Sequence, residues 1–120
     1  MPRVLIVDDA TVMRTVLRTI LTKNGYEVAG EAADGTEALG KYSEVRPDLV
    51  TMDIIMPKMT GLEALKQLMG THPEAKVIMC TADNSREMVI NCLKAGAKDY
   101  VIKPFSVERL LDAIKKAVGE

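Results

Sequence analysis

The 120-residue chain lacks tryptophan and carries only one phenylalanine, one histidine and two cysteines. Cys80 and Cys92 have no CxxC spacing, and His72 has no second histidine to act with. Zinc sites need clusters of such ligands and disulfides belong to oxidising compartments, so neither is expected. We interpret both cysteines as small buried hydrophobic residues, and His72, which precedes Pro73, as a loop residue without a functional partner.

Neither sign of charge dominates the chain, since 16 basic residues stand against 17 acidic ones. Nucleic-acid-binding domains normally carry a basic excess, so no nucleic-acid partner is expected. No apolar run approaches the roughly 20 residues that span a bilayer. The N-terminus also lacks the basic and apolar segments of a secretion signal. We therefore expect a cytoplasmic protein without membrane contact.

Short apolar runs alternate with segments of helical periodicity along the whole chain. The runs are residues 3–7, 26–33, 49–52, 76–80 and 99–102. Continuous apolar runs are typical of strands covered on both faces, and the more polar second run suits an edge strand. The alternation predicts an α/β fold in one domain, residues 1–120. We expect an open, doubly wound sheet of five parallel strands with five helices. Its strand order is taken as 2-1-3-4-5, the flavodoxin-like order.

Capping residues indicate where these helices begin and end. Asp34 to Glu37 and Thr60 to Glu63 have the spacing of capping boxes, in which the first side chain and the glutamate each accept a backbone N–H. Asn84 and Ser106 have the right residue types to start the last two helices. Gly70 is expected to end the third helix.

Polar residues follow four of the five predicted strands. Asp8 and Asp9 follow the first strand, Asp53 the third, Thr81 the fourth and Lys103 the fifth. Pro57 lies soon after Asp53 and prevents that strand from continuing. The carboxyl ends of parallel strands share one edge, and with this strand order the crevice opens between strands one and three. We therefore expect three carboxylates within a few ångströms of one another.

Three like charges in one crevice need a neutralising partner. Mg²⁺ prefers carboxylate, water and phosphate oxygens, while Lys103 adds positive charge and Thr81 a hydroxyl. These are the parts that phosphoryl transfer requires, with Asp53 as nucleophile. Taken singly, each residue has a simpler interpretation: Asp9 or Thr11 could cap the first helix, Thr81 a turn, and Lys103 could be a solvated charge. Their coincidence at one edge favours a functional site.

Several stretches of the chain together match one protein family. They are Val4-Leu5-Ile6-Val7-Asp8-Asp9, Met52-Asp53-Ile54-Ile55-Met56-Pro57 through Gly61, Thr81-Ala82, Lys94 to Tyr100 and Lys103-Pro104-Phe105. On these stretches the chain resembles the receiver domains of two-component response regulators over its whole length. Since no further segment accompanies these motifs, we expect a stand-alone, monomeric regulator of the chemotaxis type.

The resemblance implies a role for each matching residue. Asp53 would accept a phosphoryl group from a chemotaxis-type histidine kinase, and Lys103 and Thr81 would contact that group. A Mg²⁺ ion would be held by Asp8 (through water), Asp9, Asp53 and the backbone carbonyl of Ile55. The protein would assist its own phosphorylation and dephosphorylation without being an enzyme in the ordinary sense.

The resemblance also implies a switch. Tyr100 would swing inward as Thr81 moves, changing the face formed by the fourth helix, fifth strand and fifth helix. This face would bind a flagellar motor switch protein, and a phosphatase is a further expected partner. Family members commonly have a cis bond before the proline that matches Pro104. Many also carry a polar residue where this chain has Ile55, so Ile55→Asn is expected to change the lifetime of the phosphoryl group.

Other functions on this fold remain as alternatives. A phosphorelay intermediate, which passes its phosphoryl group to a histidine phosphotransfer protein, would use the same residues. A flavin-binding electron carrier would need a phosphate-binding loop after the first strand, where Asp8 and Asp9 would repel a phosphate. A haloacid-type phosphatase would have a second aspartate where this chain has Ile55.

Overall fold

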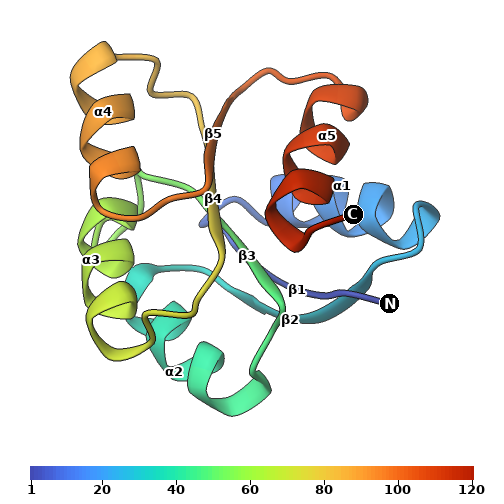
Figure 1. Cartoon of the computed structure of the whole chain (residues 1–120), viewed down its shortest axis with the longest axis horizontal. Helices are drawn as coiled ribbons and strands as arrows, with labels where there is room; N and C mark the ends of the chain where they lie inside the picture. The colour runs from blue at the N-terminus through green and yellow to red at the C-terminus, as the bar shows by residue number, and fades with distance from the viewer.

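One sheet of five parallel strands forms the centre of the molecule, in the order β2-β1-β3-β4-β5 (Figure 1). The computed structural model describes residues 1–120. The strands are β1 (Arg3–Val7), β2 (Glu27–Ala32), β3 (Leu49–Met52), β4 (Val77–Thr81) and β5 (Asp99–Ile102). All four pairings are parallel, so the predicted fold class and strand order are confirmed.

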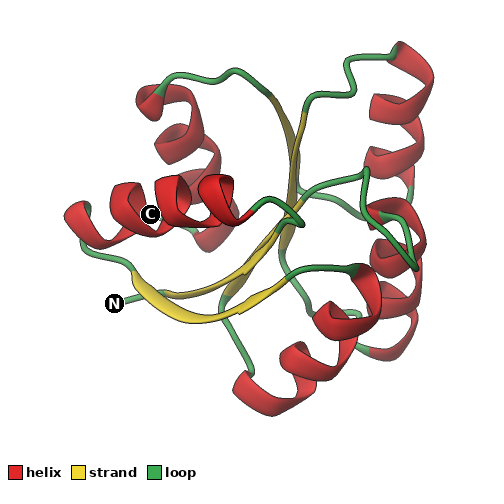
Figure 2. Ribbon diagram, turned by 180° about the vertical axis from the view of Figure 1, so that it is seen from behind, coloured by secondary structure: helices red, strands yellow, loops and turns green.

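Helices cover both faces of this sheet (Figures 1 and 2). They are α1 (Thr11–Lys23), α2 (Gly35–Val45), α3 (Gly61–Thr71), α4 (Arg86–Lys94) and α5 (Val107–Val118). Successive strand residues point to opposite faces, which creates two apolar cores. Leu5 and Val7 pack with α2, α3 and α4 in a core of 18 buried residues, whereas Val4 and Ile6 pack with α1 and α5 in a core of 11. None of the helices has the length and apolar character needed to cross a membrane.

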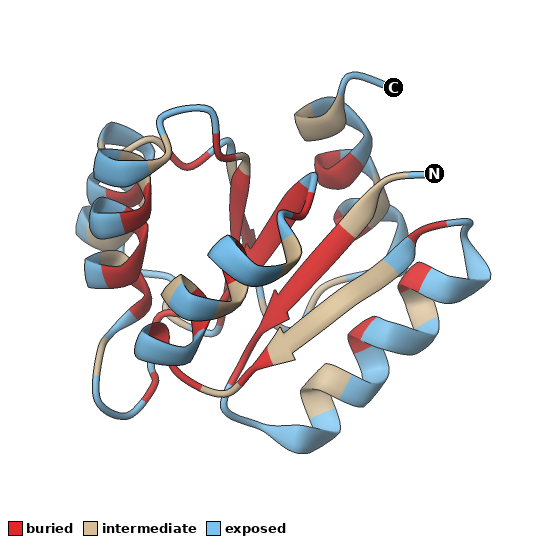
Figure 3. Cartoon of the chain, turned by 90° about the horizontal axis from the view of Figure 1, so that it is seen from below, coloured by how far each residue is buried: buried red, intermediate tan, exposed pale blue.

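The strands differ in burial according to their place in the sheet (Figure 3). Every residue of β3 and β4 is buried, whereas Ala32 is the only buried residue of β2. The polar second strand is therefore an edge strand, as its composition predicted. Cys80 and Cys92 are both buried free thiols, in agreement with their interpretation as small hydrophobic residues.

The helix termini agree with the predictions in part. The capping box at the start of α3 forms in full, and Ser106 caps α5. At the start of α2, the Asp34 side chain accepts the N–H of Glu37, but the Glu37 carboxylate reaches back one residue further than predicted, to the N–H of Ala33. Helix α4 is capped by Ser85 and not by the predicted Asn84. Helix α3 continues through the predicted stop at Gly70 and ends at Thr71.

Candidate functional site

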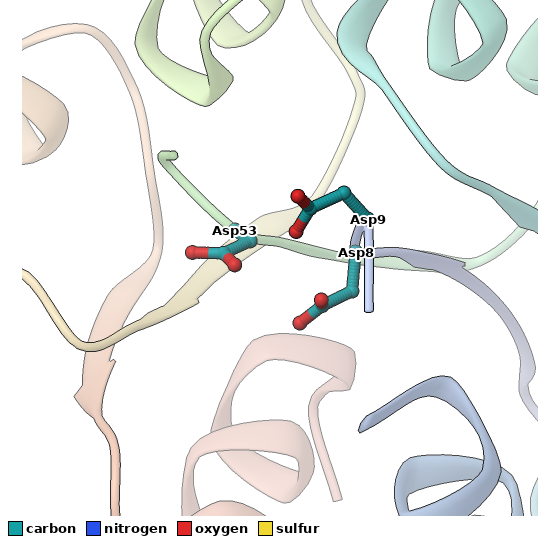
Figure 4. A group of neighbouring side chains, drawn as sticks. All are labelled: Asp8, Asp9 and Asp53. Atoms are coloured by element: carbon teal, nitrogen blue, oxygen red, sulfur yellow. The ribbon is translucent and has the colours of Figure 1, made fainter. Parts of the chain in front are cut away.

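Three carboxylates meet where β1 and β3 leave the sheet (Figure 4). Each of Asp8, Asp9 and Asp53 offers a carboxylate oxygen within 4.8 Å of the others. We refer to these three residues as the acidic cluster. Val7 pairs with Met52 in the sheet, so the next residue of each strand is also adjacent. Asp8 and Asp53 are buried and Asp9 is exposed. The sequence correctly predicted this convergence.

Lys103 partly neutralises the acidic cluster. Its Nζ lies 2.6 Å from Asp8 Oδ2 and 3.3 Å from Asp53 Oδ2. Burial by itself lowers the pKa of this amine, but the hydrogen bond to Asp8 and the charges of both carboxylates outweigh burial, so the pKa of Lys103 lies above its ordinary value. The amine is therefore a permanent cation, and the cluster of three carboxylates with one ammonium keeps an excess of negative charge.

Glycine at position 61 allows α3 to begin directly against Asp53. A Cβ atom on Gly61 would lie 1.9 Å from the carbonyl oxygen of Asp53. The Gly61 N–H instead donates to the carbonyl of Ile54 at 2.9 Å, and the Ile54 N–H donates to Asp53 Oδ1 at 2.7 Å. The glycine is thus a steric requirement for the position of the acidic side chain.

The loop after Asp53 offers a further oxygen. The carbonyl of Ile55 accepts no hydrogen bond, unlike the carbonyl of Ile54 beside it, and the Ile55 side chain is exposed. Carboxylate oxygens together with an unpaired backbone carbonyl form the all-oxygen donor set that Mg²⁺ prefers. The residues present therefore fit this ion. The cis peptide bond before Pro104, common in the resembled family, is also present.

Thr81 and Tyr100 are linked through the loop between β4 and α4. Thr81 is fully buried at the end of β4, and its hydroxyl accepts the N–H of Asp83 at 3.4 Å. Tyr100 is also buried, and its hydroxyl donates to the carbonyl of Asp83 at 2.5 Å. Burial, followed by the negative charge of Asp83, raises the pKa of Tyr100 to about 12, so the phenol remains a donor. Tyr100 is therefore buried while Thr81 is still bonded to Asp83, and the expected inward swing of Tyr100 stays a prediction.

The sequence did not identify two residues that contact this region. Arg14 Nη1 donates to the backbone carbonyl of Asp8 at 2.5 Å, and Arg14 Nε donates to Glu31 Oε1 at 3.1 Å. The helical spacing of the apolar residues around it predicts that Arg14 lies on the solvent-facing side of the first helix, and no functional side chain is expected in the second strand. One signal was available: a basic residue in the first turn of a helix opposes the helix dipole, and this first turn contains no acidic residue.

Comparison with known proteins identifies relatives along nearly the whole chain. Residues 4–115 match the response regulator receiver domain family. The chemotaxis protein CheY of Thermotoga maritima is 55% identical over 114 residues, which cover 95% of both chains. CheY of Bacillus subtilis is 51% identical over 117 residues, which cover 98% of both chains.

A solved structure gives the same result. The CheX–CheY–BeF₃–Mg²⁺ complex from Borrelia burgdorferi matches with a TM-score of 0.93 and 38% identity, covering 95% of this chain and 87% of that one. The family match over residues 4–115 reaches from β1 through β5. The chain therefore belongs to the response regulator receiver domain family and is a receiver domain of the CheY type, which makes it a signalling module.

Proposed function

We propose that this protein is a chemotaxis response regulator whose Asp53 accepts a phosphoryl group from a histidine kinase in the presence of Mg²⁺. One observation carries the proposal. The Asp53 carboxylate lies in the acidic cluster, within 3.3 Å of the Lys103 amine, at the edge of the sheet where ligands of this fold bind. The negative excess there provides a reason to bind a cation, and the cation and Lys103 together would attract a phosphoryl group.

The side chains suit an in-line transfer. An Asp53 carboxylate oxygen would form a bond to phosphorus while the phosphorus–nitrogen bond of phosphohistidine breaks, and the imidazole nitrogen would keep the electron pair. Mg²⁺, when bound, would neutralise charge on the carboxylates and on the phosphoryl oxygens. Lys103 would move its hydrogen bond from a carboxylate to a phosphoryl oxygen. The Ile54 N–H holds the other oxygen of Asp53, which orients the carboxylate.

The output would arise from the loop that holds Tyr100. A phosphoryl group adds nearly two negative charges and strong acceptor oxygens, which would draw the Thr81 hydroxyl toward it. Thr81 would then release the Asp83 N–H, and the Asp83 carbonyl is the partner of Tyr100. A local charge change would thus alter the loop that leads into α4.

The surface next to this loop has apolar side chains available for a partner. Exposed apolar residues of α4, β5 and α5 are Ile90, Leu93, Ile102 and Val107. We expect this face to bind a flagellar motor switch protein when Asp53 is phosphorylated. A phosphatase is a further expected partner; the relative from Borrelia burgdorferi was solved in complex with CheX.

Intact mass spectrometry after incubation with acetyl phosphate and Mg²⁺ tests the chemistry. The wild-type chain should gain one phosphoryl group, and Asp53→Asn should gain none. Asp48→Asn, which changes a carboxylate at the opposite end of the sheet, is the matched control and should behave as wild type. An unmodified wild-type protein, or a modified Asp53→Asn protein, would overturn the proposal.

A second experiment distinguishes the proposed output from a phosphorelay. Co-precipitation with a motor switch component that depends on the phosphodonor would support the chemotaxis function. Transfer of the phosphoryl group from Asp53 to a histidine phosphotransfer protein, without motor binding, would support the phosphorelay alternative.

A further inference from the structure

Arg14 connects the loop that carries the acidic cluster to an edge strand of the sheet. It lies in the first turn of α1, and its side chain is only 17% exposed. The guanidinium donates to the carbonyl of Asp8 at 2.5 Å, to Glu31 Oε1 at 3.1 Å and to Thr11 Oγ1 at 3.2 Å. A single side chain therefore holds the end of β1, the start of α1 and the edge strand β2 together.

Glu31 anchors the Arg14 side chain to β2. It belongs to β2, and its carboxylate also accepts a hydrogen bond from Arg18 Nε at 2.9 Å. The N–H of Asp8 donates to the carbonyl of Ala32, the next residue of β2, at 3.0 Å. Both peptide groups of Asp8 are therefore tied to β2: the N–H directly, and the carbonyl through Arg14 and Glu31.

Asp9 lacks support of its own. Its side chain is exposed, and its carboxylate has neither a hydrogen bond nor an ion pair, whereas Asp8 bonds both to Lys103 and to the N–H of Ala10. Helix α1 has no side-chain cap that would hold the loop from the other side. The direction of the Asp9 side chain therefore depends on its backbone, which begins with the rigid peptide plane that contains the Asp8 carbonyl.

We infer that Arg14, held by Glu31, is a positioning residue that fixes the peptide between Asp8 and Asp9 and so directs the Asp9 carboxylate toward the divalent cation. The inference rests on the proposed function, because it assumes that the acidic cluster binds Mg²⁺. It adds two residues, Arg14 and Glu31, that act through the backbone without touching the ion.

The positive charge of Arg14 and its hydrogen bond to the Asp8 carbonyl should affect Mg²⁺ affinity in opposite directions. The guanidinium bonds to the backbone of Asp8, a member of the acidic cluster, so removing its positive charge should by itself strengthen the attraction of the cluster for a cation. Removing its hydrogen bond to the Asp8 carbonyl should weaken binding, because Asp9 loses its orientation. The sign of the change in Mg²⁺ affinity therefore separates the two effects.

Titration calorimetry with MgCl₂ on the full chain provides the test. We expect Arg14→Met to bind Mg²⁺ about 10-fold more weakly than wild type, as is usual when a residue that orients a metal ligand is lost. Arg18→Met is the matched control, since it removes the same charge and a bond to Glu31 but does not contact Asp8. Its affinity should equal that of wild type or be slightly higher. Equal or tighter binding by Arg14→Met would overturn the inference.

Hydrogen exchange of the metal-free protein gives a second measurement. The amides of Asp9 and Ala10 should exchange faster in Arg14→Met than in Arg18→Met, while amides of the central strands stay unchanged. If Arg14→Met does not fold, Glu31→Gln replaces it: that variant keeps Arg14 but weakens its anchor, so the amides of Asp9 and Ala10 should exchange faster than in wild type. Unchanged exchange of these amides in Glu31→Gln would then overturn the inference.

The two hypotheses fail in different ways. A wild-type protein that binds no Mg²⁺ and takes up no phosphoryl group would overturn the proposed function. A wild-type protein that binds Mg²⁺, with variants at Arg14 and Glu31 that bind it equally well, would overturn only the positioning role.

Discussion

The two ends of the sheet contain the same residue types in different arrangements. At the carboxyl end, the acidic cluster meets Lys103. At the amino end, an open hollow of about 510 Å³ is lined by nine residues that also include three carboxylates and a lysine: Asp48, Glu74, Glu120 and Lys76. By composition and volume alone, the amino end would be an equally good candidate for a binding site.

The difference lies in how the carboxylates are paired. At the amino end, Asp48 accepts the N–H of Arg3 at 2.8 Å, and Glu120 accepts the hydroxyl of Tyr26 at 2.9 Å. These carboxylates do not converge, and they already serve to hold the chain termini. At the carboxyl end, three carboxylates converge, and the one ammonium pairs with only two of them, Asp8 and Asp53. Uncompensated charge at a point of convergence, and not cavity size, marks the candidate site.

The largest expected loss of stability comes from substituting Gly61, at the carboxyl end of the sheet. Gly61→Ala would place a methyl group against the Asp53 carbonyl, so we expect a loss of about 3 kcal/mol in the free energy of unfolding, as for severe overpacking. Gly70 lies in the last turn of the same helix and is exposed, and a methyl group added there would have no atom within 4 Å. Gly70→Ala should therefore gain up to about 1 kcal/mol. Urea denaturation measures both, and equal effects would contradict the steric argument.

Replacing one lysine at each end of the sheet, Lys103 or Lys76, should change the stability of the protein by different amounts. Lys103→Met leaves the acidic cluster without its ammonium, so the metal-free protein should lose about 2 kcal/mol of stability, somewhat less than for a fully buried pair. Mg²⁺ should bind this variant more tightly than wild type and restore its stability. Lys76→Met at the amino end should change stability by less than about 0.5 kcal/mol. Thermal unfolding with and without MgCl₂ provides the measurement.

Replacement of Ile55 should affect rate and leave stability unchanged. Its side chain is 67% exposed, so Ile55→Asn removes little packing. An amide at this position could hold an attacking water, and we expect phosphoryl loss to accelerate by roughly 2- to 10-fold, below the range for a positioned general base. The decay of the phosphorylated mass after removal of the phosphodonor gives the rate. Identical rates in both proteins would refute this prediction.

The smallest expected effect on stability comes from the ion pair between Arg109 and Asp99 at the amino end of the sheet, and it depends on pH. The hydrogen bond from Arg109 holds the pKa of Asp99 below its usual value, and this outweighs the opposing effect of burial. Such a lowered pKa stabilises the fold above the unfolded-state pKa of about 3.9, and this contribution is lost as the pH falls through the folded-state pKa. Arg109→Gln should raise the pKa of Asp99 and cost less than about 1 kcal/mol at neutral pH.

Carboxyl NMR titration and urea denaturation at neutral and acid pH test this prediction. The stability difference between wild type and Arg109→Gln should shrink once Asp99 is protonated in both. A constant difference across the titration would show that Arg109 acts through packing and not through charge.

Much of the site could be predicted because strand direction is a global constraint. Once the alternation of strands and helices specifies a parallel sheet, every residue that follows a strand lies at the same edge, so Asp8, Asp53, Thr81 and Lys103 converge without any knowledge of side-chain conformation. Local signals were less reliable. Asn84 and Ser85 are both good capping residues, and only the path of the loop decides that Ser85 caps α4.

The sequence by itself determined the fold class and the residues at the functional edge, because apolar periodicity and turn residues act locally and repeat along the chain. Only the tertiary structure showed that Asp83 links Thr81 to Tyr100, and that Arg14 joins Asp8 to Glu31. These contacts depend on long side chains and backbone carbonyls from separate segments. Their partners are set by three-dimensional packing, which no spacing of residues along the chain encodes.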